Sequence, residues 1–276
     1  MKASKLSGWR KVADAMWHAA DDPQIYGALD VDATNLLALI ERGRAAGHKL
    51  TATHVVGRAV AHALARVPEL NVRLVSGQAV PRESVDVFFI AVVGGGRDLS
   101  GVKVARADEK SVFEIAVELS ARARTLKGGK DPAFQRTKAL TNALPTPLLR
   151  AALRLTAWIT GDLARSVPAL SLEASPFGSA IVSSLGSIGL PMAFVPLSWM
   201  YRVPIIVVAG EIADKAVVID GRVEVRPMLP ITASIDHRYA DGFVIGEMVK
   251  PFRAYLEDPA RFEPAVVPAP EAQPSA

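Results

Sequence analysis

The sequence predicts an α+β fold in which helices flank a mixed β-sheet. Along the 276 residues, amphipathic helical patterns are interspersed with short segments rich in valine, isoleucine and phenylalanine. Several of these strand-like segments follow one another after short turns, as in a hairpin; one such turn is Ser76-Gly77. Helices and hairpin-like returns intermingle without an internal repeat, which favours a mixed sheet over a regular parallel one.

The first half of the chain contains the clearest helical patterns. An apolar stripe predicts a helix over 6–20, which Asp21-Asp22-Pro23 ends. Alternating residues predict a half-buried strand over 25–32. Two further helices are expected over 33–46, closed by Gly47, and over 51–67, between a threonine cap and Pro68.

Beyond residue 70 the pattern changes mainly to strands. A helix is expected from Ser111 to about residue 126 and another over 243–256. Strands are expected at 72–75, 85–93, 102–105, 180–183, 205–208, 216–219, 222–225 and 231–235.

Two segments differ from this pattern. Residues 131–172 contain four prolines around a basic amphipathic helix, and residues 264–276 form a Pro/Ala-rich tail that we expect to be disordered. We therefore expect one domain over 1–263 that contains an insertion at 131–172. The insertion helix could be an extra packed helix, could dock a partner, could cover a substrate channel or could lie on a membrane surface.

The composition excludes several classes of function. Half of the residues are apolar and the formal net charge is only +4, so the chain can bury a core and has a weak preference for anionic partners. No basic run with interleaved aromatic residues is present, which argues against nucleic-acid binding. The absence of cysteine excludes disulfides, thiolate metal sites and a cysteine nucleophile.

The sequence also bears on location. The N-terminal residues lack the apolar core of a signal peptide, so we expect a cytoplasmic protein. The uncharged run 188–201 is interrupted by Pro191 and Pro196, and buried strands with turns explain it better than a membrane span.

Two possible sites are weak. Gly94-Gly95-Gly96 follows an apolar strand but fits neither phosphate-binding fingerprint. His54, Arg58 and His62 share one helix face, but without cysteine or clustered acids we expect no metal there, only a partly exposed basic face.

His237 is the strongest candidate for chemistry. It follows an apolar strand, so it lies at the edge of the fold where a substrate can reach it. Asp241 lies four residues on, close enough to orient the ring or to pair with a cation, and Gly242 permits a tight turn. From spacing alone, a structural histidine in a charged turn remains the alternative.

The wider sequence favours the catalytic interpretation. Residues 237–242, His-Arg-Tyr-Ala-Asp-Gly, match the His-Arg-x-x-Asp-Gly signature of the catalytic domain of dihydrolipoamide acyltransferase (E2) of 2-oxo acid dehydrogenase complexes. The chain resembles that family in order over most of 5–262, except at 131–172. Further matching segments are 6–16, 53–71, 85–93, 108–116, 180–186 and 255–259.

The resemblance implies a chloramphenicol-acetyltransferase-like fold, assembled as a trimer with each active site between two subunits. His237 would remove the proton from a thiol of CoA or dihydrolipoamide, and the thiolate would attack an acyl thioester. Ser183, by its match to the family's serine, would donate a hydrogen bond to the oxyanion. Asp241 would have a structural or electrostatic role, with Arg10 or Lys11 as a possible partner.

Departures from the family pattern leave two alternatives open. We expect no lipoyl arm on this chain, so a lipoyl group or a 2-oxo acid dehydrogenase partner would come from another chain. The end of the chain differs from the family's apolar anchor, so a trimer is expected and a larger cage is in doubt. A non-catalytic scaffold is one alternative. A small-molecule O-acetyltransferase is the other, although such enzymes have a second histidine where this chain has Asp236.

Overall fold

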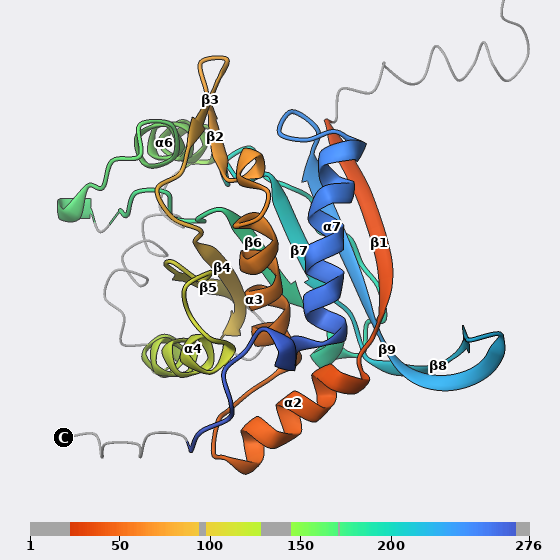
Figure 1. The fold of residues 1–276 in the computed structure, drawn as a ribbon. Coiled ribbons are helices and arrows are strands. Elements are labelled where there is room, and N and C mark those ends of the chain that lie inside the picture. The colour runs from red at the N-terminus through yellow and green to blue at the C-terminus, as the bar shows by residue number, and fades with distance from the viewer. Residues whose placement is uncertain (1–22, 94–97, 128–144, 171, 269–276) are drawn as a thin grey trace, which may run out of the picture.

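A seven-stranded mixed sheet forms the centre of the fold (Figure 1). The computed structural model describes residues 23–93, 98–127, 145–170 and 172–268. The strand order is β1-β9-β7-β6-β4-β5, with β8 paired to β9 beyond this path. These strands are β1 (Gln24–Asp32), β4 (Val87–Val93), β5 (Asp98–Val104), β6 (Ala180–Ser184), β7 (Ile205–Ala209), β8 (Ala213–Ile219) and β9 (Arg222–Asp236).

The sheet combines both pairing directions. β6 pairs in parallel with β4 and β7. The other pairs are antiparallel: β1 with β9, β7 with β9, β8 with β9 and β4 with β5. The short strands β2 (Val72–Val75) and β3 (Gln78–Pro81) form a separate hairpin around the predicted turn. The expected α+β class with a mixed sheet is confirmed.

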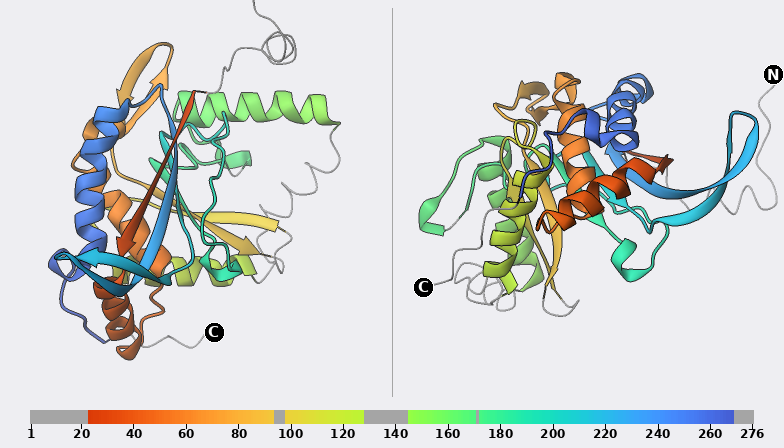
Figure 2. Two further views of the ribbon diagram at one scale, coloured as in Figure 1. Left: turned by 90° about the vertical axis from the view of Figure 1, so that its right-hand side faces the viewer. Right: turned by 60° about the horizontal axis from the view of Figure 1, so that its bottom comes forward.

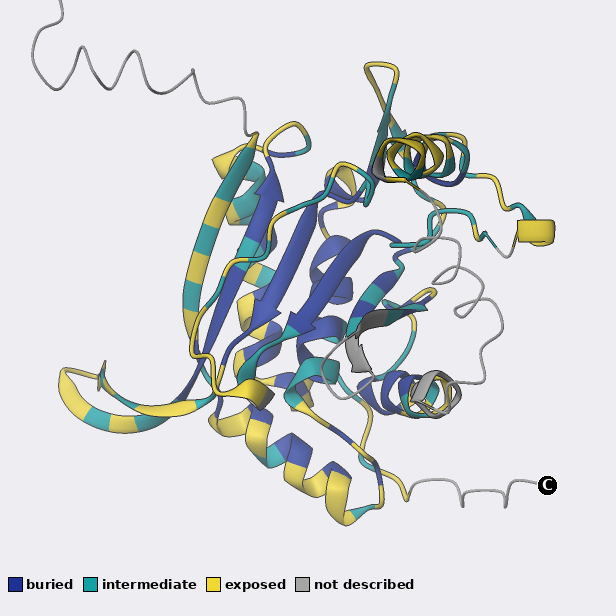
Figure 3. Ribbon diagram, turned by 180° about the vertical axis from the view of Figure 1, so that it is seen from behind, coloured by how far each residue is buried: buried dark blue, intermediate teal, exposed yellow. Residues whose placement is uncertain are grey.

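Helices cover one face of the sheet. α3 (Ala52–Leu64) and α7 (Gly242–Glu257) run along this face, and α2 (Thr34–Ala45) and α4 (Val112–Lys127) lie toward one end of it (Figure 1). From behind, the central strands are buried as well (Figure 3). On that side Ile181, Ile206 and Val208 pack with apolar side chains that include Val195, Leu197 and Tyr201. Both faces of the sheet are therefore core.

The predicted helices over 33–46, 51–67, 111–126 and 243–256 are confirmed, whereas the final strands differ from the prediction. The segments 222–225 and 231–235 belong to one strand, β9, despite Pro227 and Pro230. Residues 231–235 have a paired strand on each side, β1 and β7. Both prolines lie outside this stretch, where a missing backbone N–H donor is tolerated. With β8, the first half of β9 forms a hairpin that projects from the body (Figure 2).

The basic face of α3 is more buried than the sequence suggested. His62 is only 5 % exposed, and the Arg58 side chain lies 3.4 Å from the Glu263 carboxylate, which also accepts a hydrogen bond from Tyr255. The expectation of a partly exposed basic face is wrong for His62, because the Phe262 ring of the C-terminal segment packs against it, whereas Arg58 remains partly exposed. The burial of His62 makes its charge state part of the folding energetics.

Stability is expected to fall as the pH drops from about 6.5 toward 4. Burial lowers the pKa of His54 and of His62 from 6.5 to about 4, and Arg66 and Arg58 add to the effect at His62. Because the unfolded state binds these protons first, stability is fully present above pH 6.5 and decreases through this window. Thermal denaturation at several pH values between 6.5 and 4 measures the loss of stability. In a His54→Gln/His62→Gln variant the melting temperature should depend less on pH. An equally steep dependence would contradict the assignment of this effect to the two histidines.

The segments that departed from the main pattern are partly described. α6 (Thr146–Ala157) continues into a π-helical turn, Trp158–Asp162, and Leu148, Leu155 and Trp158 are exposed. At the other end, Val266 packs against the core and the Val267 carbonyl contacts His48 Nε2 at 2.8 Å, so the described residues include the first part of the expected tail. The predicted helix over 6–20 lies outside the described residues. None of the helices in the described part is long and apolar enough to cross a membrane.

Candidate active site

The predicted motif forms the tight connection between β9 and α7. Asp236 ends the strand and is buried, and its backbone N–H donates to Pro204 O. The Arg238 guanidinium donates to both carboxylate oxygens of Asp236 at 2.5–3.1 Å, and the Arg238 backbone N–H donates to the same carboxylate at 3.0 Å. The hydrogen bonds that Arg238 donates to the Asp236 carboxylate raise the pKa of Arg238. This charged turn fixes the backbone on both sides of His237.

His237 has a fixed backbone and an accessible side chain. Its N–H donates to the Pro23 carbonyl at 2.7 Å, which ties it to the start of β1. The side chain is exposed, and among the described residues its imidazole makes no hydrogen bond. A histidine presented in this way can exchange a proton with an external group.

Asp241 is the N-cap of α7. Its carboxylate accepts hydrogen bonds from the backbone N–H groups of Phe243 at 3.0 Å and Val244 at 3.1 Å. These are N–H groups that the first turn of a helix cannot satisfy internally. In the described part of the chain Asp241 therefore holds the helix that follows His237, and its carboxylate makes no hydrogen bond or ion pair with the His237 ring. Arg10 and Lys11 lie outside the described residues.

Asp241→Ala is expected to destabilise the protein by about 1 kcal/mol, because the capped N–H groups lose their acceptor. Asp241→Asn keeps a capping oxygen and should lose much less. Urea denaturation of both variants measures the difference. If the alanine and asparagine variants were equally destabilised, the carboxylate charge, and not the cap, would be its main contribution.

A pocket lies beside the motif. Its wall includes Asp236, Arg238, Tyr239, Trp199 and Arg202. Burial raises the pKa of Tyr239, so this hydroxyl stays protonated at neutral pH. Both arginines are already engaged in ion pairs, Arg238 with Asp236 and Arg202 with Asp162.

The ion pair between Arg202 and Asp162 connects this pocket to the insertion. Arg202 Nε and Nη2 approach the Asp162 carboxylate at 2.8 and 3.0 Å, and Arg73 donates to the carbonyls of Gly161 and Asp162. Sequence reasoning missed this contact. The signal was present, since Arg202 is the one charge between 188 and 210 and a lone charge in an apolar run needs a partner.

Ser183 lies far from His237 within the chain. It lies on β6 and is 7 % exposed. Its partner on β7 is Val208, and the partner of Val208 on β9 is Thr232. His237 follows Thr232 by five positions, which corresponds to about 17 Å along a strand. The two predicted catalytic residues are thus at opposite ends of the sheet, and one chain alone does not bring them together.

The histidine face of α3 offers no metal site in the described residues: no group of three His, Asp or Glu side chains there could hold an ion. His54 Nδ1 instead accepts a hydrogen bond from the Thr51 backbone N–H at 3.1 Å and completes a capping box.

Comparison with known families and proteins adds an independent line of evidence. Residues 1–135 and 164–263 match the family model described as 2-oxoacid dehydrogenases acyltransferase (catalytic domain). The unmatched gap falls within the predicted insertion at 131–172.

Curated relatives agree with this match. The dihydrolipoyllysine-residue acetyltransferase component of the pyruvate dehydrogenase complex of Bacillus subtilis is 27 % identical over 92 % of this chain and 50 % of its own length. The lipoamide acyltransferase component of the branched-chain alpha-keto acid dehydrogenase complex of the same organism is 24 % identical over 93 % of this chain and 52 % of its own length. This chain thus spans about half the length of these relatives.

Solved structures share the fold. A probable dihydrolipoamide acetyltransferase from Listeria monocytogenes is 23 % identical, covers 96 % of this chain and 98 % of its own, and superposes with a TM-score of 0.66. The Azotobacter vinelandii dihydrolipoamide acetyltransferase, studied for the role of a serine, a histidine and an asparagine in catalysis, has 21 % identity and a TM-score of 0.63, with 95 % and 93 % coverage.

Proposed function

The chain belongs to the family of 2-oxoacid dehydrogenases acyltransferase catalytic domains, and from this premise we propose that it transfers an acyl group between CoA and a dihydrolipoyl or other thiol. The observation that carries the proposal is His237, an exposed imidazole held by its backbone within a rigid charged turn. The curated relatives are named as acyltransferases that act on lipoamide or a dihydrolipoyllysine residue.

In this proposal His237 is the general base. Its neutral imidazole takes the proton of the attacking thiol, and the sulfur attacks the carbonyl carbon of the acyl thioester. The tetrahedral intermediate carries its negative charge on oxygen, toward which the Ser183 hydroxyl donates a hydrogen bond. Collapse expels the second sulfur, which recovers the proton from His237. The acyl group passes directly between two thiols, so the chain needs no cysteine of its own.

The proposed site lies between two copies of the chain. The separation of Ser183 from His237 in one chain supports this arrangement, because a neighbouring copy could place its serine opposite the histidine. The segment 188–199 also exposes large apolar side chains that would suit such an interface. They are Ile188, Leu190, Met192, Phe194 and Trp199, next to Tyr26 of β1.

We propose that the functional unit is a homotrimer. A lipoyl group on another chain would be the second substrate, either as the acyl donor or as the thiol acceptor. One related structure of 21 % identity is the cubic core of a pyruvate dehydrogenase multienzyme complex, and a larger cage of this chain would be built from such trimers. Neither arginine beside the motif is proposed as a CoA ligand, since Arg202 is paired with Asp162 and Arg238 with Asp236.

A direct assay tests the proposal. Purified protein is mixed with free dihydrolipoamide and a panel of acyl-CoAs, and CoA release is followed while light scattering gives the mass. Turnover by a trimer supports the proposal. An assembly that neither binds nor turns over CoA would instead indicate a non-catalytic scaffold, and acetylation of hydroxyl acceptors alone would indicate an O-acetyltransferase.

A further inference from the structure

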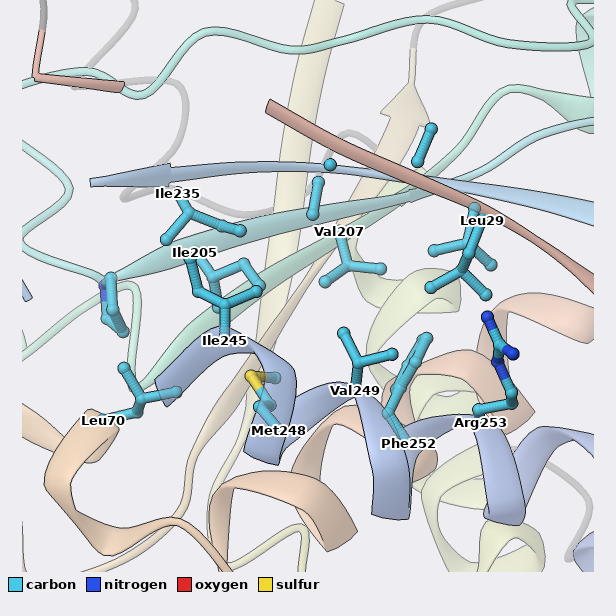
Figure 4. Close-up of a pocket in the computed structure, with 15 residues that line it drawn as sticks. Leu29, Leu70, Ile205, Val207, Ile235, Ile245, Met248, Val249, Phe252 and Arg253 are labelled. Atoms are coloured by element: carbon cyan, nitrogen blue, oxygen red, sulfur yellow. The ribbon is translucent and has the colours of Figure 1, made fainter. Parts of the chain in front are cut away.

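An apolar cavity lies between α7 and the sheet, on the helix-covered face (Figure 4). Its volume is about 190 Å³, and β1, β7, β9 and α7 provide most of its wall. Every lining residue is apolar except Arg253. The proposed acyl transfer uses none of the side chains in this wall.

Two small residues create the cavity. Gly27 of β1 lies directly opposite Ala233 of β9, between the larger pairs Ile25–Ile235 and Leu29–Ile231. A methyl group built on Gly27 would have no atom within 4 Å, so nothing fills the space beneath this pair. α7 closes the other side with Met248 and Phe252.

Arg253 gives the cavity one charged end. The residue is exposed, and its guanidinium extends toward Leu29 at one end of the row of lining side chains in Figure 4. Among the described residues, no carboxylate lies within ion-pair distance of it. The charge of Arg253 is therefore available to a ligand whose apolar part occupies the cavity.

We propose that this cavity binds a short aliphatic carboxylate, with the hydrocarbon chain beneath α7 and the carboxylate on Arg253. Water is a poor occupant because an ordered water needs two to four polar partners, and this wall offers almost none. If a methylene group occupies roughly the 30 Å³ of a liquid water, the cavity accommodates about six carbon atoms. An arginine fork suits a carboxylate better than it suits a neutral head group.

Hexanoate is the probe, and isothermal titration of the full chain without CoA is the measurement. Saturable binding to the wild type is expected. Gly27→Leu should abolish it by filling the cavity, and should raise the melting temperature by about 2–4 °C. Gly246→Ala is the matched control: it stabilises an exposed turn of α7 outside the cavity and should leave binding unchanged.

The charged end is tested separately. Arg253→Gln should weaken hexanoate binding by about tenfold, and hexan-1-ol should bind the wild type more weakly than hexanoate by a similar factor. Equal binding of the acid and the alcohol would overturn the role of Arg253. Failure of the wild type to bind hexanoate, or equal binding by Gly27→Leu, would overturn the site as a whole. Since CoA is absent, neither result depends on acyl transfer.

Discussion

His237→Ala is expected to lower kcat for acyl transfer by about 10²–10⁴-fold, the usual contribution of a positioned general base. At neutral pH a free thiol is mostly protonated and nucleophilic only as its thiolate, so the loss should fall on the chemical step. Steady-state kinetics with acyl-CoA and dihydrolipoamide measure it.

The fold should survive this change. The described hydrogen bond of His237 is made by its backbone N–H, which donates to Pro23 and remains in the alanine variant. The control is urea denaturation, whose midpoint should be the same for His237→Ala as for the wild type. Wild-type activity in a correctly folded His237→Ala protein would contradict the assignment of this residue as the base.

Ser183→Ala is expected to lower kcat by about 10²–10³-fold with little change in KM, because an oxyanion donor acts mainly on the transition state. The adjacent Ser184→Ala is the matched control, since neighbouring residues of a strand point to opposite faces. Kinetics of both variants give the comparison. Equal effects at the two positions would indicate that β6 tolerates neither change and that Ser183 has no specific role.

Much of the fold follows from local patterns in the sequence. The apolar stripe of α3 and the valine-rich strands β4 and β7 are set by periodicity, which depends on neighbouring residues alone. The continuity of β9 could not be predicted in this way. Two prolines within a strand normally indicate a break, and only the pairing with β8, β1 and β7 shows where they are tolerated.

The candidate site is predictable in part. The motif around His237 is local and is found from the sequence. The sequence predicts Asp241 as a partner of the ring or of a cation, whereas in the structure its carboxylate is the N-cap of α7. The distance between Ser183 and His237 depends on the register of three strands that are remote in sequence, and the ion pair between Arg202 and Asp162 depends on how the insertion packs. Such long-range contacts leave no periodic signal in the chain.

The central claim, an active site shared between two copies, is tested most directly by complementation. His237→Ala and Ser183→Ala chains carrying different tags are co-expressed, and assemblies that contain both are purified through both tags. In a mixed trimer, one interface combines the intact histidine of one chain with the intact serine of the next, so activity should recover to about one third of wild type. Activity no higher than that of either variant alone would contradict the shared site.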